Sequence, residues 1–224
     1  MSKESLYVRL RDANADDWSD YVDHAFVRGI GDGSLPVECF RHYLIQDYLF
    51  LIQFARAYAL AGYKSQSLDE IREAAESMRI ITDVEMGLHV KFCSDWGICE
   101  AQMQAADEAE DTMAYTRYVL ERGLAGDLLD LYVALAPCMF GYAVIGKNLM
   151  NSPETKKSGN PYMPWIEMYA SDEYQEVMVG GIEKLDRLYE QRAGQGRMPD
   201  LIKTFGQATR LEIRFWQMGM DAAN

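Results

Sequence analysis

Apolar side chains recur with a period of about 3.6 residues along the whole chain, and no long stretch alternates between apolar and polar positions. This period places apolar side chains on one face of an α-helix, whereas a half-buried strand needs a period of two. The pattern therefore predicts an all-α protein, a single helical bundle of about seven or eight helices. No internal repeat or long linker divides the sequence, so we expect one domain over residues 1–224.

The predicted helices are separated by turn-forming segments. GDGSLP (31–36) ends in a proline suited to a helix start, NSPETKKSGNP (151–161) is the longest polar loop, and AGQGRMP (193–199) is the last turn. The expected helical ranges are 5–30, 36–63, 68–97, 100–121, 127–150, 161–170, 172–192 and 198–221.

Charge and apolar runs exclude several classes of partner. Acidic side chains outnumber basic ones by 35 to 22, for a net charge of -13, and no Lys/Arg cluster offsets this. Such a surface repels nucleic-acid phosphates and anionic lipids. The N-terminus lacks the apolar core of a signal peptide, and the longest uncharged run, between Asp130 and Lys147, is short for a membrane span. We expect a cytoplasmic protein that binds neither nucleic acid nor a membrane.

Cysteine spacing supports the same compartment. The chain has four cysteines, with neither CxxC spacing nor the density of a disulfide framework. We therefore expect free thiols in a reducing cytoplasm.

Three predicted helices carry a reactive side chain where the apolar pattern requires a core residue. Asp47 interrupts an apolar stripe in the second helix, Glu212 interrupts one in the last helix, and Cys138 shares a face with Tyr142 and Ile145. A buried unpaired carboxylate is costly and responds by raising its pKa. For each acid, a structural role, in which the carboxyl group pairs with an Arg or Tyr side chain, explains the pattern as well as a functional role does. A lone buried cysteine is more often a small core residue.

Pro137 stands directly before Cys138, inside the apolar stretch ALAPCMFGYAVIG (134–146). Proline in a helix interior removes a backbone hydrogen bond and costs roughly 3 kcal/mol. A kink there can leave amide N–H groups facing the thiol, and such dipoles lower a cysteine pKa. We therefore expect Pro137 to present and activate Cys138, with Gly141 clearing space beside the thiol.

Metal and haem ligands form a weaker pattern. Glu85 and His89 lie one helical turn apart, but bundle di-metal sites use Glu-x-x-His pairs, and none of the three histidines follows a glutamate by three residues. His24 or His89 could serve as an axial haem ligand, but a lone histidine on a helix is more often structural. No Gly-rich phosphate loop, GxSxG elbow or zinc spacing occurs in the sequence. We expect no metal and no organic cofactor.

Seven segments, in order along nearly the whole chain, carry a resemblance to a known family. They are HAFVRGIGDGSLP (24–36), FRHYLIQDYLFL (40–51), VEMGLHVKF (84–92), AYTRY (114–118), ALAPCMFGY (134–142), WIEMYAS (165–171) and LEIRFW (211–216). The set resembles the TenA proteins, or thiaminase II, in the branch that keeps a nucleophilic cysteine. The resemblance implies a haem-oxygenase-like bundle without haem, assembled as a homotetramer.

The same resemblance implies a hydrolase acting on an aminopyrimidine at its exocyclic methylene carbon. The favoured substrate would be 4-amino-5-aminomethyl-2-methylpyrimidine, a breakdown product of thiamin, yielding the hydroxymethyl pyrimidine and ammonia. Thiamin, losing its thiazole, would be a second substrate. The implied role is thiamin salvage.

Site roles follow from the resemblance position by position. Cys138 is the expected nucleophile, reacting through a covalent adduct, and Glu212 is the expected proton donor and acceptor. Asp47 is expected to hydrogen-bond the amino edge of the pyrimidine. The pocket lining and ring contacts are expected from Tyr115, Tyr142, Tyr169, Phe50 and Phe215.

Three positions depart from the family pattern. The family often has tyrosine where Phe50 stands, proline at Ala25 and an aromatic residue at Leu211. These departures concern pocket shape and ligand preference more than the nucleophile and acid.

Two other function classes stay open. An oxidase on the same bundle would need a His- and Arg-rich pocket or further metal ligands, which three scattered histidines do not supply. A non-catalytic binding or regulatory protein is compatible with 13 methionines and 14 tyrosines, because Met-rich surfaces make adaptable contacts. The acidic charge disfavours DNA as the partner of such a protein.

Overall fold

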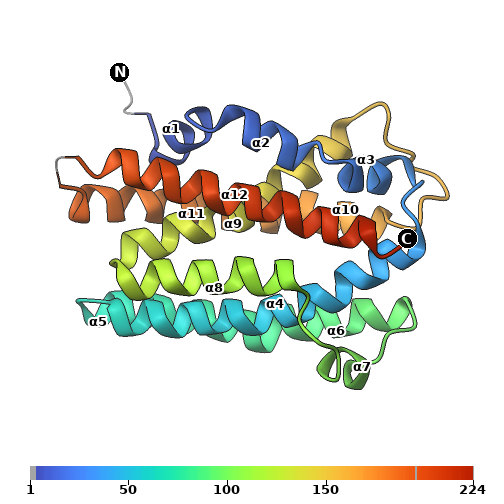
Figure 1. The fold of residues 1–224 in the computed structure, drawn as a ribbon, viewed down its shortest axis with the longest axis horizontal. Coiled ribbons are helices and arrows are strands. Elements are labelled where there is room, and N and C mark those ends of the chain that lie inside the picture. Colours follow the sequence, from blue (N-terminus) through green and yellow to red (C-terminus); the bar gives the residue numbers. More distant parts are fainter. Residues whose placement is uncertain (1–3, 195, 224) are drawn as a thin grey trace.

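The computed structural model describes residues 4–194 and 196–223, and every secondary-structure element within these ranges is helical. The predicted all-α bundle is confirmed. In Figure 1, α12 runs lengthwise across the middle, with α1, α2 and α3 along one side of it and α8 and α4 along the other. The elements are α1 (Leu6–Asp12), α2 (Ala15–Val22), α3 (Ala25–Asp32), α4 (Val37–Lys64), α5 (Leu68–Arg79), the π-helix η1 (Ile80–Glu85), α6 (Met86–Asp95), α7 (Glu100–Gln104), α8 (Glu110–Ala125), α9 (Leu128–Asn151), α10 (Met163–Ala170), α11 (Asp172–Arg192) and α12 (Met198–Asp221).

The start of α9 is fixed by three capping hydrogen bonds and two ion pairs. The Asp127 carboxylate accepts from the backbone N–H groups of Leu129 and Asp130 at 2.9 and 3.3 Å. Asp130 accepts from the Asp127 N–H at 2.8 Å, which completes a capping box. Arg197, just before α12, pairs with Asp127 at 2.7 Å and with Asp130 at 2.8 Å. These contacts fix where α9 begins relative to α12.

Helix α9 is the central helix of the bundle. All of its residues from Leu128 to Pro137 are buried, so it has no solvent-facing side over this stretch. By length and composition alone α9 is apolar enough to cross a membrane, but 83% of its most apolar window is buried inside the bundle. This burial is that of a core helix.

The predicted helix over 5–30 is wrong in extent, because side chains that bond the backbone divide it into α1, α2 and α3. The Asn14 amide donates to the carbonyls of Leu10 and Ile202 at 2.8 and 3.2 Å. The His24 imidazole caps the first turn of α3. At both breaks, a side chain therefore bonds a backbone group that would have a backbone partner in a continuous helix.

The predicted helix over 100–121 is likewise divided, into α7 and α8. Gln46 of α4 bonds the connecting segment: its amide donates to the Asp107 carbonyl at 3.0 Å and accepts from the Ala109 N–H at 2.9 Å. This buried glutamine replaces the backbone partners that a continuous helix would have supplied.

The predicted range 68–97 follows one helical path, but its middle is a π-helix. Within Ile80–Glu85 the hydrogen bonding lengthens by one residue, as shown by the Met86 N–H, which bonds the Ile81 carbonyl. A π segment changes which side chains face a neighbouring helix, and such segments are frequent at functional sites.

Pro137 lies inside α9 without ending the helix. Tyr21 of α2 packs against Gly141, one turn later, where an added Cβ would overlap the Tyr21 ring. The Tyr21 hydroxyl lies 3.5 Å from the Pro137 carbonyl oxygen. The space left at Gly141 is therefore filled by Tyr21, and the expectation that it stays clear beside Cys138 is wrong.

Gly141→Ala is expected to lower the free energy of unfolding by about 1–3 kcal/mol, because the methyl group must displace a packed tyrosine. Gly180→Ala in α11 is the matched control, since nothing lies within 4 Å of its new Cβ. It should raise stability by roughly 0.5–1 kcal/mol through helix propensity. Urea unfolding followed by circular dichroism measures both, and a stabilising Gly141→Ala would contradict the packing described.

Candidate active site

Glu212 of α12 lies at the centre of a buried polar cluster. The residue is 1% exposed, and Tyr115 of α8 donates a hydrogen bond to its Oε1 at 2.8 Å. Tyr21 and the Cys138 thiol also hydrogen-bond this carboxyl group. Burial raises the pKa of Glu212 to about 8, although these three donors act in the opposite direction. A carboxyl group of this kind exchanges a proton near neutral pH.

Cys138 faces Glu212 from α9. Burial, followed by the negative charge of Glu212, raises the pKa of the thiol well above its ordinary value. The expectation that Pro137 lowers this pKa is therefore wrong for the free protein. The backbone N–H of Cys138 instead hydrogen-bonds Tyr115, whose pKa is raised well above its ordinary value by burial and by the charge of Glu212. A thiolate at this position requires a base for its proton, and Glu212 is hydrogen-bonded to the thiol.

Asp47 joins the cluster from α4. Its Oδ2 lies 3.5 Å from Nδ1 of His89 in α6. Burial raises the pKa of Asp47, and the charge of His89 opposes that effect. The negative charge of Asp47 also contributes to the raised pKa values of Glu212 and Cys138. The two acids and the thiol are thus electrostatically linked.

Aromatic rings surround these polar groups. The Phe50 ring centroid lies 5.2 Å from that of Tyr115 and 5.9 Å from that of Phe215. The ring centroids of Tyr142 and Tyr169 lie 4.9 Å apart, and burial, with smaller contributions that include Asp47, raises the pKa of both phenols. The structure therefore brings together, from five helices, all the site residues expected from the sequence: Cys138, Glu212, Asp47, Phe50, Tyr115, Tyr142, Tyr169 and Phe215.

Four further residues of the cluster were not predicted to belong to it: Tyr21, Glu85, His89 and Tyr174. Burial and the nearby Asp47 raise the pKa of Glu85 to about 7. Burial, then Glu85 and Cys138, raise that of Tyr174. The sequence pattern indicated Glu85 and His89 only as possible metal ligands. Their spacing of four residues places both on one helix face, and this could have predicted that they lie in the same cluster. Within the described residues, no three His, Cys, Asp or Glu side chains form a group able to hold a metal ion.

The three departures from the family pattern lie in different places. Phe50 is in the cluster, where its ring contacts Tyr115 without offering a hydroxyl. Ala25 is exposed at the start of α3, and Leu211 lines a surface groove. Among the three, the substitution at Phe50 is the one that changes a group inside the cluster.

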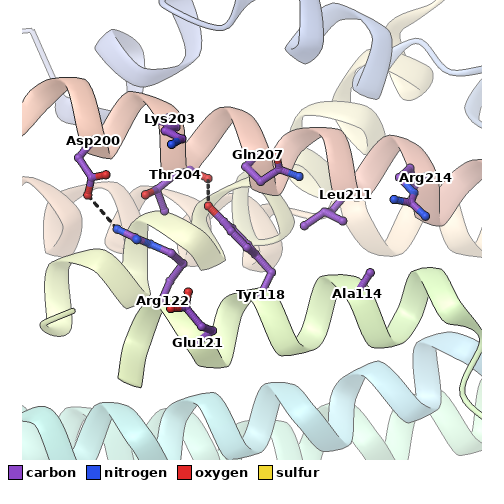
Figure 2. Close-up of a pocket in the computed structure, with 10 residues that line it drawn as sticks. All are labelled: Ala114, Tyr118, Glu121, Arg122, Asp200, Lys203, Thr204, Gln207, Leu211 and Arg214. Atoms are coloured by element: carbon purple, nitrogen blue, oxygen red, sulfur yellow. Dashed lines mark hydrogen bonds and ion pairs between the residues drawn. The ribbon is translucent and has the colours of Figure 1, made fainter. Parts of the chain in front are cut away.

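That surface groove lies between α8 and α12 (Figure 2). Two of its polar side chains have partners within the groove: Arg122 contacts Asp200 at 2.8 Å, and the Tyr118 hydroxyl donates to the Thr204 carbonyl at 3.4 Å. None of its lining residues is a cysteine or a histidine. The groove therefore lacks a strong nucleophile, and the interior cluster is the candidate active site.

Comparisons with known proteins agree on a family. Residues 12–222 match the model of the TENA/THI-4/PQQC family. An aminopyrimidine aminohydrolase of Halalkalibacterium halodurans is 37% identical over 206 residues, which cover 91% of this chain and 90% of that protein.

Solved structures share the fold. The chain is similar to a TenA family transcription regulator from Silicibacter sp. TM1040, with a TM-score of 0.89, 42% identity and 96% of both chains covered. It also resembles a domain of unknown function with a heme oxygenase-like fold from Shewanella denitrificans, with a TM-score of 0.65, 12% identity, and 100% and 93% of the two chains covered. The predicted haem-oxygenase-like fold is confirmed. By sequence and by fold, the chain belongs to the TENA/THI-4/PQQC family.

Proposed function

We propose that the chain is an aminopyrimidine aminohydrolase that hydrolyses 4-amino-5-aminomethyl-2-methylpyrimidine and also splits thiamin. The observation that carries the proposal is the thiol of the half-buried Cys138 hydrogen-bonded to the Glu212 carboxyl group, which also accepts a hydrogen bond from Tyr115. A similar protein that is named an aminopyrimidine aminohydrolase supports hydrolase chemistry on a pyrimidine.

The Cys138–Glu212 pair supplies a nucleophile and one mobile proton. The Glu212 carboxylate takes the thiol proton as sulfur forms a bond to a ring carbon, and the resulting acid gives that proton to a ring nitrogen. Addition breaks the aromaticity of the ring, so its electrons can expel the substrate's amino group, which is protonated at neutral pH, as ammonia from the exocyclic carbon. Burial keeps the acid form of Glu212 available near neutral pH, because it raises the pKa to about 8, and the ring nitrogen becomes more basic as sulfur adds to the ring.

The second half of the reaction restores the ring and the thiol. Water adds to the exocyclic carbon and loses one proton. The ring nitrogen then returns its proton through Glu212 to the departing sulfur as the C–S bond breaks, and the pyrimidine regains its aromaticity. The products are the hydroxymethyl pyrimidine and ammonia, or the free thiazole when thiamin is the substrate. Covalent catalysis thus divides one difficult displacement into two easier steps.

The remaining residues of the cluster orient the pyrimidine. Asp47 accepts a hydrogen bond from the exocyclic amino group. The phenyl rings of Phe50 and Phe215, whose centroids lie 5.9 Å apart, pack against the pyrimidine ring. Tyr142 and Tyr169 line the adjoining wall, and Tyr115 keeps Glu212 directed at the reacting groups.

Several expectations stay predictions. They are one domain over residues 1–224, a homotetramer, a cytoplasmic location and a role in thiamin salvage.

Transcriptional regulation is the second candidate function, because the similar Silicibacter protein is named a regulator. A net charge of -13 opposes binding to DNA phosphates. A regulator also has no need for a thiol hydrogen-bonded to a carboxyl group whose pKa is near 8. Turnover of a pyrimidine discriminates between the two candidates.

Cys138→Ala is expected to reduce hydrolysis of the aminomethyl pyrimidine by about 10³-fold or more, since it removes the attacking sulfur. Cys99→Ala removes an exposed thiol outside the cluster and should leave the rate unchanged. Products are quantified by mass spectrometry. Equal rates for wild type and Cys138→Ala would contradict covalent catalysis by this residue.

The pH dependence of kcat/KM should report Glu212. The pair must hold a single proton, so protonation of the carboxyl group below a pH of about 8 removes the base, and kcat/KM should rise with pH through that value. Glu212→Gln should abolish this rise and lower kcat by about 10²–10⁴-fold. Tyr115→Phe should move the rise to higher pH, because the Tyr115 hydrogen bond lowers the pKa of Glu212. An unchanged midpoint in Tyr115→Phe would contradict this assignment.

A further inference from the structure

His89 makes two polar contacts, and these bear on which of its ring nitrogens carries a proton. Nε2 lies 2.8 Å from the Leu44 carbonyl oxygen, and a carbonyl only accepts, so Nε2 carries a proton. Nδ1 lies 3.5 Å from Oδ2 of Asp47. Without a further proton, the lone pair of Nδ1 would face a carboxylate oxygen, and the two would repel each other. A proton on either Nδ1 or Oδ2 would replace this repulsion by an attraction.

The fold fixes this pair on one turn of α4. Leu44 and Asp47 are three residues apart on that helix, so the His89 ring bridges a backbone carbonyl and a side chain of the same turn. Both side chains are enclosed, His89 at 10% exposure and Asp47 at 12%. The π-helix Ile80–Glu85 ends one turn before His89 and contributes Glu85 to the same cluster. A carbonyl of a long helix cannot turn away, so it anchors the ring.

Among the described groups around Asp47, His89 is the one that stabilises its carboxylate form. Among the causes that shift the pKa of Asp47, burial raises it and His89 lowers it. Among the residues that the structure describes, the other groups that interact electrostatically with Asp47 are acids, thiols and phenols, and none of these stabilises a carboxylate by positive charge. They are Glu85 of η1, Cys93 of α6, Cys138 and Tyr142 of α9, Tyr43 of α4, Tyr169 of α10, Tyr174 of α11 and Glu212 of α12.

We propose that His89 is a positioning residue that acts through Asp47: it shares one proton with Oδ2 and so keeps the carboxyl group able to accept, through Oδ1, from the amino group of an aminopyrimidine. This role rests on the proposed function, in which Asp47 binds that amino group. Without His89, burial leaves Asp47 protonated to a higher pH. A protonated carboxyl group is a weaker acceptor, so binding at neutral pH weakens.

His89→Gln tests the proposal, because glutamine removes the charge but keeps a donor for the Leu44 carbonyl. KM for the aminomethyl pyrimidine should rise about tenfold at neutral pH, with kcat nearly unchanged, because the hydrogen bond that Asp47 accepts loses its charge assistance. The variant-to-wild-type KM ratio should return toward one as the pH is raised. Using the ratio at each pH cancels the contribution of Glu212.

His42→Gln is the matched control. It removes another half-buried imidazole, from the same helix as Asp47, and should leave the KM ratio at one at every pH. A KM ratio for His89→Gln that does not vary with pH, or an effect on kcat alone, would overturn the role of His89. If wild type hydrolyses no aminopyrimidine, the proposed function fails instead, so the two failures are distinguishable.

Nitrogen NMR of wild type labelled with ¹⁵N-histidine provides a second readout that needs neither turnover nor a folded His89 variant. The sequence has only three histidines, so the His89 signals can be assigned with His24 and His42 variants. Nε2 of His89 should be protonated throughout the pH range in which the protein is folded. A neutral ring with its proton on Nδ1 and a bare Nε2 would overturn the proposal.

Discussion

A carboxyl group buried in the middle of a helical bundle needs hydrogen-bond donors, and the arrangement around Glu212 follows from that requirement. Its donors, Tyr115, Tyr21 and Cys138, come from α8, α2 and α9, so four helices including α12 meet at one carboxyl group. Gly141 is part of the same arrangement, because only a residue without a side chain admits Tyr21 there. The interactions that satisfy the acid are also those that join it to a thiol.

How much of the fold was predictable depended on whether the determining contact was local. The apolar period predicted α4, α9, α11 and α12 nearly to their ends, because each buries a continuous stripe or a whole helix. The breaks at Asn14 and before α8 were missed. Asn14 bonds the Ile202 carbonyl of α12, and Gln46 bonds the segment that precedes α8, so both depend on distant chain segments. The π-helix was missed for lack of a sequence signature.

The candidate site shows the same limit. Helical spacing placed Asp47, Cys138 and Glu212 inside, and the family resemblance supplied their expected roles. The electrostatics were not predictable, because the pKa of Cys138 depends on Glu212 of another helix, and that of Asp47 on His89. Reasoning from Pro137 alone gave the opposite direction for the thiol. Its activation is instead a property of the Cys138–Glu212 pair.

A covalent bond between Cys138 and the pyrimidine can be observed by intact-protein mass spectrometry of rapidly quenched reactions. Wild type mixed with the aminomethyl pyrimidine should gain the mass of the substrate less ammonia before water completes the reaction. Proteolysis should locate that mass on the peptide containing Cys138. Substrate turnover with no adduct under conditions that trap such intermediates, or an adduct on another residue, would contradict the account.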